Sequence, residues 1–317
     1  MKKFLALIIL SLILGIGVAN SNEIIKKDGF LIPTNKWKDK IKIDENFKVN
    51  NPEDKIIIIY NHGSDGNDVK LKDCFWIREL RNWAQLAGDK INGKEIMVYI
   101  HCQGQLEGDL GAKLGKRGMW MKKWEGPYPG TSKMDRRVEG NLEVVKKFTN
   151  LGVPKNQIFM SGHSCGGWAT LRLTAKYMNE VGGGISLMPA CFWNLSKKYK
   201  VKKDGYEKAM EKFHKKYPGM AEWRQAQIDI IKEGNAPILI FTHPMDPYEG
   251  LTSDWMDDIP NFKRVVVSEK KKVNGKKCNT AGSNWEEPLK DLHIINHADC
   301  FMHYHPLIKE YIASRLK

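Results

Sequence analysis

An unbroken apolar run, Lys55-Ile-Ile-Ile-Ile-Tyr60, constrains the fold of this chain most strongly. The run lacks the apolar–polar alternation of a strand that faces water on one side, so its strand must be buried on both faces. Strands of this kind belong to parallel sheets that helices cover on both sides. Turn-forming residues follow at once, from Asn61 to Gly66. The run therefore predicts a central parallel strand with a loop at its carboxyl end.

Similar apolar runs recur along the chain and alternate with segments of helical spacing. Strands are predicted at 95–100, 157–160, 185–188, 237–241, 264–267 and 292–295, and helices at 77–87, 138–148, 168–178 and 306–316. Alternation of strand, crossover helix and strand predicts an α/β protein with a mostly parallel central sheet flanked by helices. The chain has 317 residues and no internal repeat, so one domain is expected over 22–317. Within it, the polar, Lys-rich segment 194–234 predicts a helical cap or lid insertion.

The first 21 residues have the layout of a secretory signal peptide. Lys2 and Lys3 supply positive charge, Phe4 to Val18 is apolar or small, and Ala19 or Ser21 offers a small residue for cleavage. An uncleaved membrane anchor is the alternative, but the apolar run is short of the roughly twenty residues that a bilayer requires. We expect a secreted or periplasmic protein that does not stay inserted in a membrane.

Export would place the six cysteines in an oxidising compartment, where disulfides form and persist. Six cysteines allow many pairings, and the sequence does not choose among them. Cys278 with Cys300 is the favoured pair, since it would close a polar segment near the C-terminus. Cys165 is expected to pack beneath its turn or to pair with another cysteine, and free buried cysteines are the alternative for the set.

The formal net charge of +14 comes from lysines that are spread along the chain. A basic surface can attract anionic substrates or polymers. Because the lysines form no cluster within a nucleic-acid-binding motif, we interpret them as a property of the solvated surface. No nucleic-acid partner is expected.

The strongest local signal is Gly162-His163-Ser164-Cys165-Gly166, which stands between a predicted strand and a predicted helix. This context turns a common G-x-S-x-G string into a candidate nucleophile elbow. In such an elbow the central residue occupies strained backbone, and the flanking glycines allow two chain segments to approach closely. The positive end of the following helix favours negative charge at the same place. Ser164 is the predicted nucleophile.

The elbow and its flanking elements resemble the α/β-hydrolase superfamily, with a layout most like the dienelactone hydrolase-like and secreted esterase groups. The resemblance extends from about residue 50 to the end of the chain. Dienelactone hydrolases proper carry cysteine at the elbow, whereas this chain has Ser164 followed by Cys165. The resemblance therefore implies the fold and acyl-transfer chemistry but not the dienelactone substrate.

The resemblance also implies roles for residues that follow the other strands. The order nucleophile, acid, base assigns the acid to Asp246, after strand 237–241, and the base to His297, after the predicted strand 292–295. His303 is the alternative base. The oxyanion hole is expected from the backbone N–H groups of Cys165 and Ser64.

A long Gly-rich connection, 103–134, contains Trp120, Trp124 and Tyr128. Long loops in compact domains are commonly functional, so these rings are candidates for the substrate pocket; packing within the loop is the alternative. The expected reaction is hydrolysis of a small-molecule or polymeric carboxylic ester, with no cofactor and no metal.

Three rival functions stay open on the sequence. A serine peptidase of the same fold would use the same residues. A non-catalytic binding protein could keep the scaffold, because fold does not imply function. A metal hydrolase could use a C-terminal group that contains typical zinc ligands, namely His297, Asp299, Cys300, His303 and His305. Their spacing matches no helical zinc motif, and sensitivity to a chelator would separate this rival from the others.

Overall fold

The computed structural model describes residues 24–25, 28–35, 39–63, 75–102, 133–191, 204–216, 218–244, 246–267, 272–273, 276–277, 292–297 and 299–316. Their centre is a nine-stranded sheet with the order β11-β10-β9-β8-β4-β7-β2-β3, in which β6 also pairs with β7. Its strands are β2 (Gly29–Leu31), β3 (Ile43–Asp44), β4 (Lys55–Asn61), β6 (Lys90–Ile91), β7 (Lys94–His101), β8 (Ile158–His163), β9 (Gly183–Leu187), β10 (Ile238–Thr242) and β11 (Phe262–Val266). Two short pairs lie apart from this sheet: β1 (Ile24–Ile25) with β5 (Phe75–Trp76), and β12 (Lys272–Val273) with β13 (Lys276–Lys277).

The six strands from β7 to β11 in this order run parallel, whereas β2, β3 and β6 join antiparallel at one side. The prediction of a mostly parallel sheet is thus confirmed, and the predicted strands at 55–60, 95–100, 157–160, 185–188, 237–241 and 264–267 correspond to β4, β7, β8, β9, β10 and β11. The predicted strand at 292–295 is wrong, because this segment belongs to a 3₁₀ helix, η7 (Leu292–His297).

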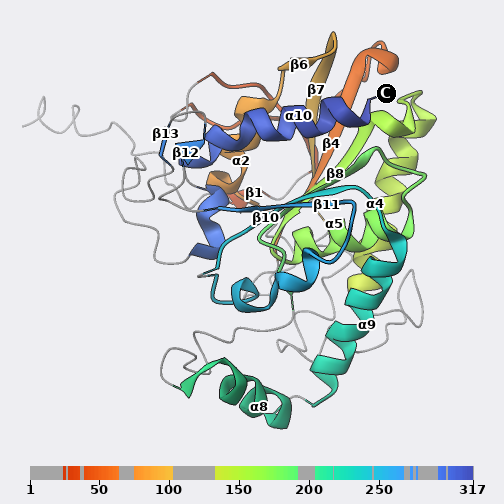
Figure 1. Ribbon diagram of the computed structural model, residues 1–317. Helices are drawn as coiled ribbons and strands as arrows, with labels where there is room; N and C mark the ends of the chain where they lie inside the picture. Colours follow the sequence, from red (N-terminus) through yellow and green to blue (C-terminus); the bar gives the residue numbers. More distant parts are fainter. Residues whose placement is uncertain are drawn as a thin grey trace, which may run out of the picture.

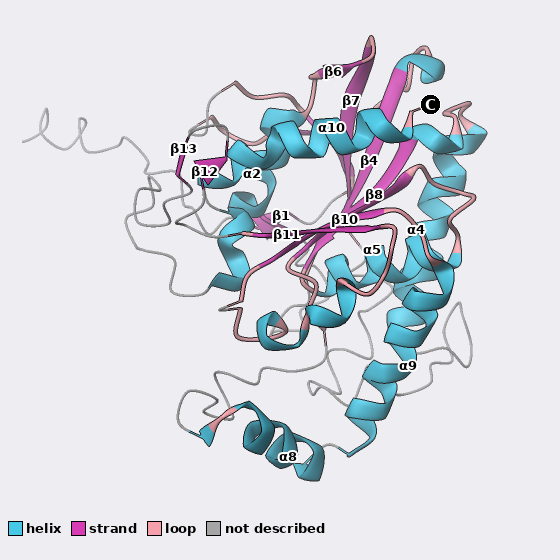
Figure 2. Ribbon diagram, in the orientation of Figure 1, coloured by secondary structure: helices cyan, strands magenta, loops and turns pink. Residues whose placement is uncertain are grey.

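Helices cover both faces of the sheet (Figures 1 and 2). The helices α2 (Ile77–Leu86) and α10 (His305–Arg315) lie on one face, and α4 (Lys133–Asn150), α5 (Cys165–Lys176) and α9 (Pro218–Gly234) lie on the other. The four isoleucines of β4 serve both sides, since Ile57 and Ile59 pack with α4 and α5, while Ile56 and Ile58 pack with α2. Each is fully buried, which stabilises the fold by about 1.5–3 kcal/mol per side chain. This double burial explains the continuous apolar run.

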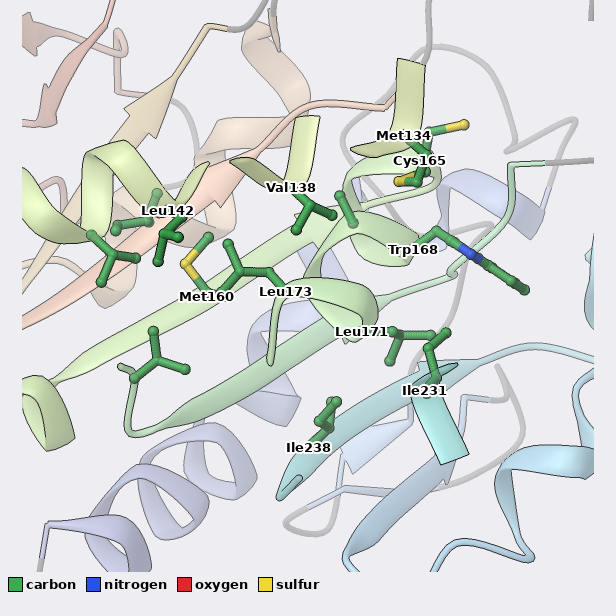
Figure 3. Packing of buried hydrophobic residues seen from close by; sticks show 14 of the residues in the cluster. Met134, Val138, Leu142, Met160, Cys165, Trp168, Leu171, Leu173, Ile231 and Ile238 are labelled. Carbon is green, nitrogen blue, oxygen red and sulfur yellow. The ribbon is translucent and has the colours of Figure 1, made fainter. Parts of the chain in front are cut away.

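Figure 3 shows the larger of these two packed layers from close by. Met160 of β8 lies beside Leu142 of α4 and Leu173 of α5, and Ile231 of α9 comes next to Leu171. Short 3₁₀ helices connect the main elements: η1 (Pro52–Asp54), η3 (Lys155–Gln157), η4 (Gly250–Thr252), η5 (Asp254–Met256) and η8 (Asp299–Tyr304). Among the described helices, none combines the length and the apolar character that a membrane crossing needs.

The segment 194–234, expected as a cap, divides into two parts. Helix α8 (Tyr206–Lys216) lies away from the sheet, next to the first turns of α9 (Figure 1). The last turns of α9 instead pack on α5, where Ile228 and Ile231 are buried in the core. This half of α9 is therefore the crossover helix between β9 and β10, and among the described residues of the segment only α8 and the first turns of α9 stand outside the helix layer.

Candidate active site

The backbone at Ser164 has the conformation of a nucleophile elbow. Strand β8 ends at His163, α5 begins at Cys165, and Ser164 between them has φ 56° and ψ −122°. Few non-glycine residues adopt such a conformation, which costs about 1–3 kcal/mol. A Cβ atom on Gly162 would lie 2.5 Å from the carbonyl carbon of Gly166, and one on Gly166 would lie 2.4 Å from the Asn61 oxygen. The two flanking glycines are therefore required by close backbone approach.

The elbow stands where the sheet topology favours a binding site. Strand β8 neighbours β4, and the chain continues from β4 to β7 on one side and from β8 to β9 on the other. Ligand sites of open α/β sheets form at such a switch point, outside the carboxyl ends of the strands. Ser164 follows β8, and the loops that follow the parallel strands β4 and β10 begin at the same edge of the sheet.

Three side chains form a continuous hydrogen-bonded row at this edge. Nε2 of His293 lies 2.8 Å from Oγ of Ser164, and Nδ1 of the same ring lies 2.7 Å from Oδ2 of Asp246. A carboxylate only accepts, so Nδ1 carries the proton and Nε2 accepts from the hydroxyl. The Ala190 carbonyl is a second acceptor for that hydroxyl, at 3.2 Å. His293 and Asp246 are almost fully buried, which strengthens these interactions.

The sequence analysis expected His297, or His303, in this position, and the structure corrects that expectation. His293 contacts both Ser164 and Asp246, whereas the ring of His297 stacks edge-on to His163, with 4.8 Å between ring centroids. The error follows from the predicted strand at 292–295, which enclosed His293 and made His297 the first loop histidine. In the 3₁₀ helix η7, His293 instead faces the elbow.

The turn that carries Asp246 is held by its own backbone. The N–H of Asp246 donates to the His243 carbonyl at 2.9 Å, and the N–H of Tyr248 donates to Oδ1 at 2.8 Å. Both carboxylate oxygens therefore have partners, and Oδ2 stays directed at His293. The Tyr248 ring also packs on the His293 ring, with 4.4 Å between centroids.

A buried ion pair supports the same turn from outside. The Arg224 guanidinium of α9 donates to both oxygens of Glu249, with a shortest distance of 2.8 Å, and also to the Thr252 carbonyl. Burial raises the pKa of Glu249, which outweighs the lowering that Arg224 and Thr252 cause. The carboxylate therefore depends on Arg224 to remain charged.

Behind His293 lies a second group of buried polar side chains. Nε2 of His163 donates to the His293 carbonyl at 2.8 Å, and Nδ1 of His163 lies 3.7 Å from Oε1 of Glu79. The Tyr60 hydroxyl donates to the same oxygen of Glu79 at 2.9 Å. Burial, together with the neighbouring His293 and His297 rings, keeps the pKa of His163 well below its usual value.

The loop after β4 lies directly against Ser164. A Cβ atom on Gly63 would be 3.2 Å from Cβ of Ser164. The buried guanidinium of Arg137, from α4, donates to the carbonyls of His62 and Gly63 at 2.9 and 3.4 Å. In a trans peptide the N–H points away from the carbonyl, so the N–H of Gly63, which follows the His62 carbonyl, points away from Arg137. Arg137 thus sets the direction of this donor.

A disulfide joins the residue after Ser164 to the loop that follows β9. Cys165 pairs with Cys191, with a Cα–Cα distance of 4.5 Å, which confirms the pairing alternative for Cys165. Cys102 is also disulfide-bonded, and the described cysteines include no free thiol. The favoured pair of Cys278 with Cys300 falls outside what is described, because Cys278 lies in 278–291.

Several predicted site residues also fall outside the described ranges. Ser64, expected in the oxyanion hole, lies in 64–74, and the three aromatic candidates for the substrate pocket lie in 103–132, namely Trp120, Trp124 and Tyr128. Their roles stay predictions. The structure does bring together Ser164 and Asp246, two residues 82 positions apart that the sequence analysis had placed in one site.

No protein-family model and no curated protein sequence matches this chain. Among solved structures, it is similar to a carboxylesterase from a metagenomic library, EstE1, at 12% identity and a TM-score of 0.48, over 94% of this chain and 92% of that one. An esterase from Pyrobaculum calidifontis is 14% identical, with a TM-score of 0.45, over 93% and 85% of the two chains. An esterase from Rhizomucor miehei is 12% identical, with a TM-score of 0.47, over 92% and 84%.

The parallel sheet, its strand order and the elbow after β8 define an α/β-hydrolase fold. The finer grouping expected from the sequence, with dienelactone hydrolase-like and secreted esterases, has no support in these comparisons.

Proposed function

We propose that this protein is a serine hydrolase that cleaves carboxylic esters, with Ser164 as nucleophile, His293 as general base and Asp246 as orienting acid. One observation carries the proposal: a single buried imidazole lies 2.8 Å from the serine hydroxyl and 2.7 Å from a carboxylate. A serine hydroxyl is a weak nucleophile at neutral pH and needs a positioned base. The arrangement supplies the base and fixes its tautomer.

In the first step, Oγ of Ser164 attacks the ester carbonyl carbon while its proton moves to Nε2 of His293. Asp246 stays ionised and accepts from Nδ1, so it stabilises the imidazolium that forms. The carbonyl π electrons move onto the oxygen, which becomes an oxyanion. The elbow conformation of Ser164 directs Oγ out of the sheet edge, toward an incoming substrate.

The oxyanion requires N–H donors that are already in place. We assign one to Cys165, the first residue of α5, where the helix also contributes a positive end. The second belongs to the loop after β4, at Gly63 or Ser64. Arg137 is a positioning residue for that donor, because it binds the carbonyls of this loop from behind.

Collapse of the tetrahedral intermediate breaks the bond to the alcohol, and the imidazolium of His293 protonates the departing oxygen. Water then enters, gives its proton to His293 and attacks the acyl group. Release of the acid returns the proton to Ser164. The cycle consumes one water and needs no oxidant or reductant.

Covalent labelling by a fluorophosphonate probe tests the proposal directly. The wild type should label and should turn over a panel of nitrophenyl acyl esters, whereas Ser164→Ala should do neither. His293→Gln should lower kcat at least about 10³-fold, because the nucleophile loses its base. The matched control is His303→Gln, a histidine of the same C-terminal region that we leave without a catalytic role.

Three results would overturn the assignment: no labelling of folded wild type, equal losses in both histidine variants, or activity that survives Ser164→Ala. A peptide panel run beside the esters tests the substrate class. Turnover of peptides alone would retain the triad but reject the ester assignment.

We also propose that the protein is exported through its first 21 residues. The support is the charged, apolar and small-residue order of that segment. Expression of the full chain followed by N-terminal sequencing of the mature product tests this. A product that starts near residue 20–22 in the exported fraction is expected, and an intact Met1 there would reject cleavage.

A further inference from the structure

A second constellation lies beneath the candidate active site and takes no part in the proposed mechanism. It consists of Glu79 of α2, His163 at the end of β8 and His297 of η7, each of which offers one potential ligand atom. These atoms all lie within 4.8 Å of one another, and the three side chains are buried. Buried charges and imidazoles converge in this way where they are paired or where they bind a metal.

The hydrogen bonds of His163 fix which of its nitrogens is available. Nε2 lies 2.8 Å from the His293 carbonyl, which can only accept, so Nε2 carries the proton. The other ring nitrogen, Nδ1, faces Oε1 of Glu79 at 3.7 Å. A ring nitrogen and a carboxylate oxygen that face each other inside a protein call for a proton or a metal ion between them.

The surroundings resemble the outer shell of a metal site. A metal-ligating histidine usually donates its second ring N–H to a backbone carbonyl or a carboxylate, as His163 does toward His293. A ligating carboxylate is usually hydrogen-bonded in turn, and the Tyr60 hydroxyl donates to Glu79 at 2.9 Å. These contacts set both the tautomer of the imidazole and the direction of the carboxylate.

We propose that Glu79, His163 and His297 bind one divalent transition-metal ion of the zinc class. Two imidazoles and one carboxylate suit Zn²⁺ better than Mg²⁺ or Ca²⁺, which prefer oxygen ligands. Metal–ligand bonds of about 2.0–2.2 Å place neighbouring ligand atoms about 3.3 Å apart. The spacing of 3.7 Å between Glu79 and His163 therefore needs only a small contraction. The widest separation among the three ligand atoms, 4.8 Å, must shorten by about 1.5 Å.

This proposal departs from the sequence-based expectation of no metal and uses a different set of residues from the C-terminal cluster weighed there. It does not rest on the proposed function, because none of the three ligand atoms belongs to Ser164, His293 or Asp246. The ion would join α2, the end of β8 and η7. Since η7 carries His293, the ion would hold that helix in place against the sheet edge.

The test is zinc binding to the full chain, purified without a histidine tag and treated with a chelator. Titration calorimetry with Zn²⁺ should give one site per chain with a micromolar or tighter Kd. Glu79→Gln and His297→Asn should each weaken binding at least about 10-fold, since each removes one of three ligands. The control His303→Asn should bind as the wild type does. Co²⁺ should give visible absorption bands that the same two variants lose.

If a variant does not fold, a measurement on the wild type still tests the proposal. Equimolar Zn²⁺ should raise the Tm of the chelator-treated protein by several degrees, because an ion that binds only the folded state stabilises it. Two results would overturn the proposal: chelator-treated wild type that neither binds Zn²⁺ at 100 µM nor changes its Tm, or binding that both ligand variants retain. Fluorophosphonate labelling is scored separately, so a failure here leaves the serine-hydrolase proposal intact.

Discussion

Removal of the Cys165–Cys191 disulfide should destabilise the protein by an amount that its loop length predicts. The two cysteines are 26 residues apart, and the bond therefore restricts a loop of that length in the unfolded chain. The chain-entropy relation gives about 3.5 kcal/mol at 25 °C for a loop of this size. The double variant Cys165→Ala/Cys191→Ala should lose about this much free energy of unfolding.

The assay is urea unfolding of the wild type and the double variant, followed by circular dichroism and Trp fluorescence. Coincident transitions would justify a two-state fit, and the midpoint should fall while the m-value changes little or rises slightly. The single variants serve as controls, because each removes the cross-link and also leaves one unpaired thiol. All three variants should therefore lie within about 1 kcal/mol of one another.

The same double variant tests whether the disulfide contributes to stability or to chemistry. The backbone contacts of Gly162 and Gly166 remain in it, so the elbow should keep its shape below the new Tm. Fluorophosphonate labelling at 15 °C should stay within about tenfold of the wild-type rate, which corresponds to less than 1.4 kcal/mol. A loss of stability below about 1 kcal/mol would refute the loop-entropy reasoning. A complete loss of labelling in folded protein would refute the view that the glycine contacts suffice.

Three further predictions concern the neighbourhood of the site. Gly166→Ala should abolish labelling and destabilise the fold by more than about 2 kcal/mol, because its Cβ would meet the Asn61 oxygen at 2.4 Å; wild-type labelling and Tm would refute this. Glu249→Gln should cost about 3 kcal/mol in urea unfolding by leaving the buried Arg224 charge poorly paired, and a cost under 1 kcal/mol would contradict the burial argument. Burial lowers the pKa of His305 from 6.5 to about 4. The contribution of this neutral side chain to the free energy of unfolding is therefore complete above pH 6.5 and is lost as the pH falls toward 4. Wild type should therefore lose up to about 3 kcal/mol more than His305→Asn over that interval, and parallel pH profiles would reject the shift.

Local patterns sufficed for most of the sheet and for the elbow at Ser164. Strand β4 could be predicted because its isoleucines are buried on both faces, and only a strand between two helix layers has that pattern. Ser164 could be predicted because the close backbone contacts of the elbow demand glycine at two fixed positions. Asp246 was found by its place after a buried strand, since the carboxyl ends of parallel strands meet at one edge.

The proposed base, His293, was missed because its signal is not local. Leu292, Ile294 and Ile295 surround His293 with apolar residues, and this pattern favours a strand. The segment is a 3₁₀ helix instead, and it is held by tertiary hydrogen bonds: the His293 carbonyl accepts from His163, and the Asn296 carbonyl accepts from Asn82. Partners more than 100 residues away leave no periodicity in the segment. The one available clue was a histidine inside an apolar run, which calls for a polar partner wherever it is buried.

At the elbow, two features that stabilise the fold also restrain the conformation of Ser164. Ser164 is held in a conformation that costs about 1–3 kcal/mol, and it persists only because the surrounding structure over-determines it. Two independent restraints do so: the glycine contacts between β8, α5 and β4, and the disulfide at Cys165. If the glycine contacts alone set the geometry, the disulfide variant unfolds more readily yet reacts normally in its folded state. If the disulfide sets the geometry, the labelling rate of the folded variant falls together with its stability. The glycine contacts then cannot hold Ser164 in its conformation without the disulfide.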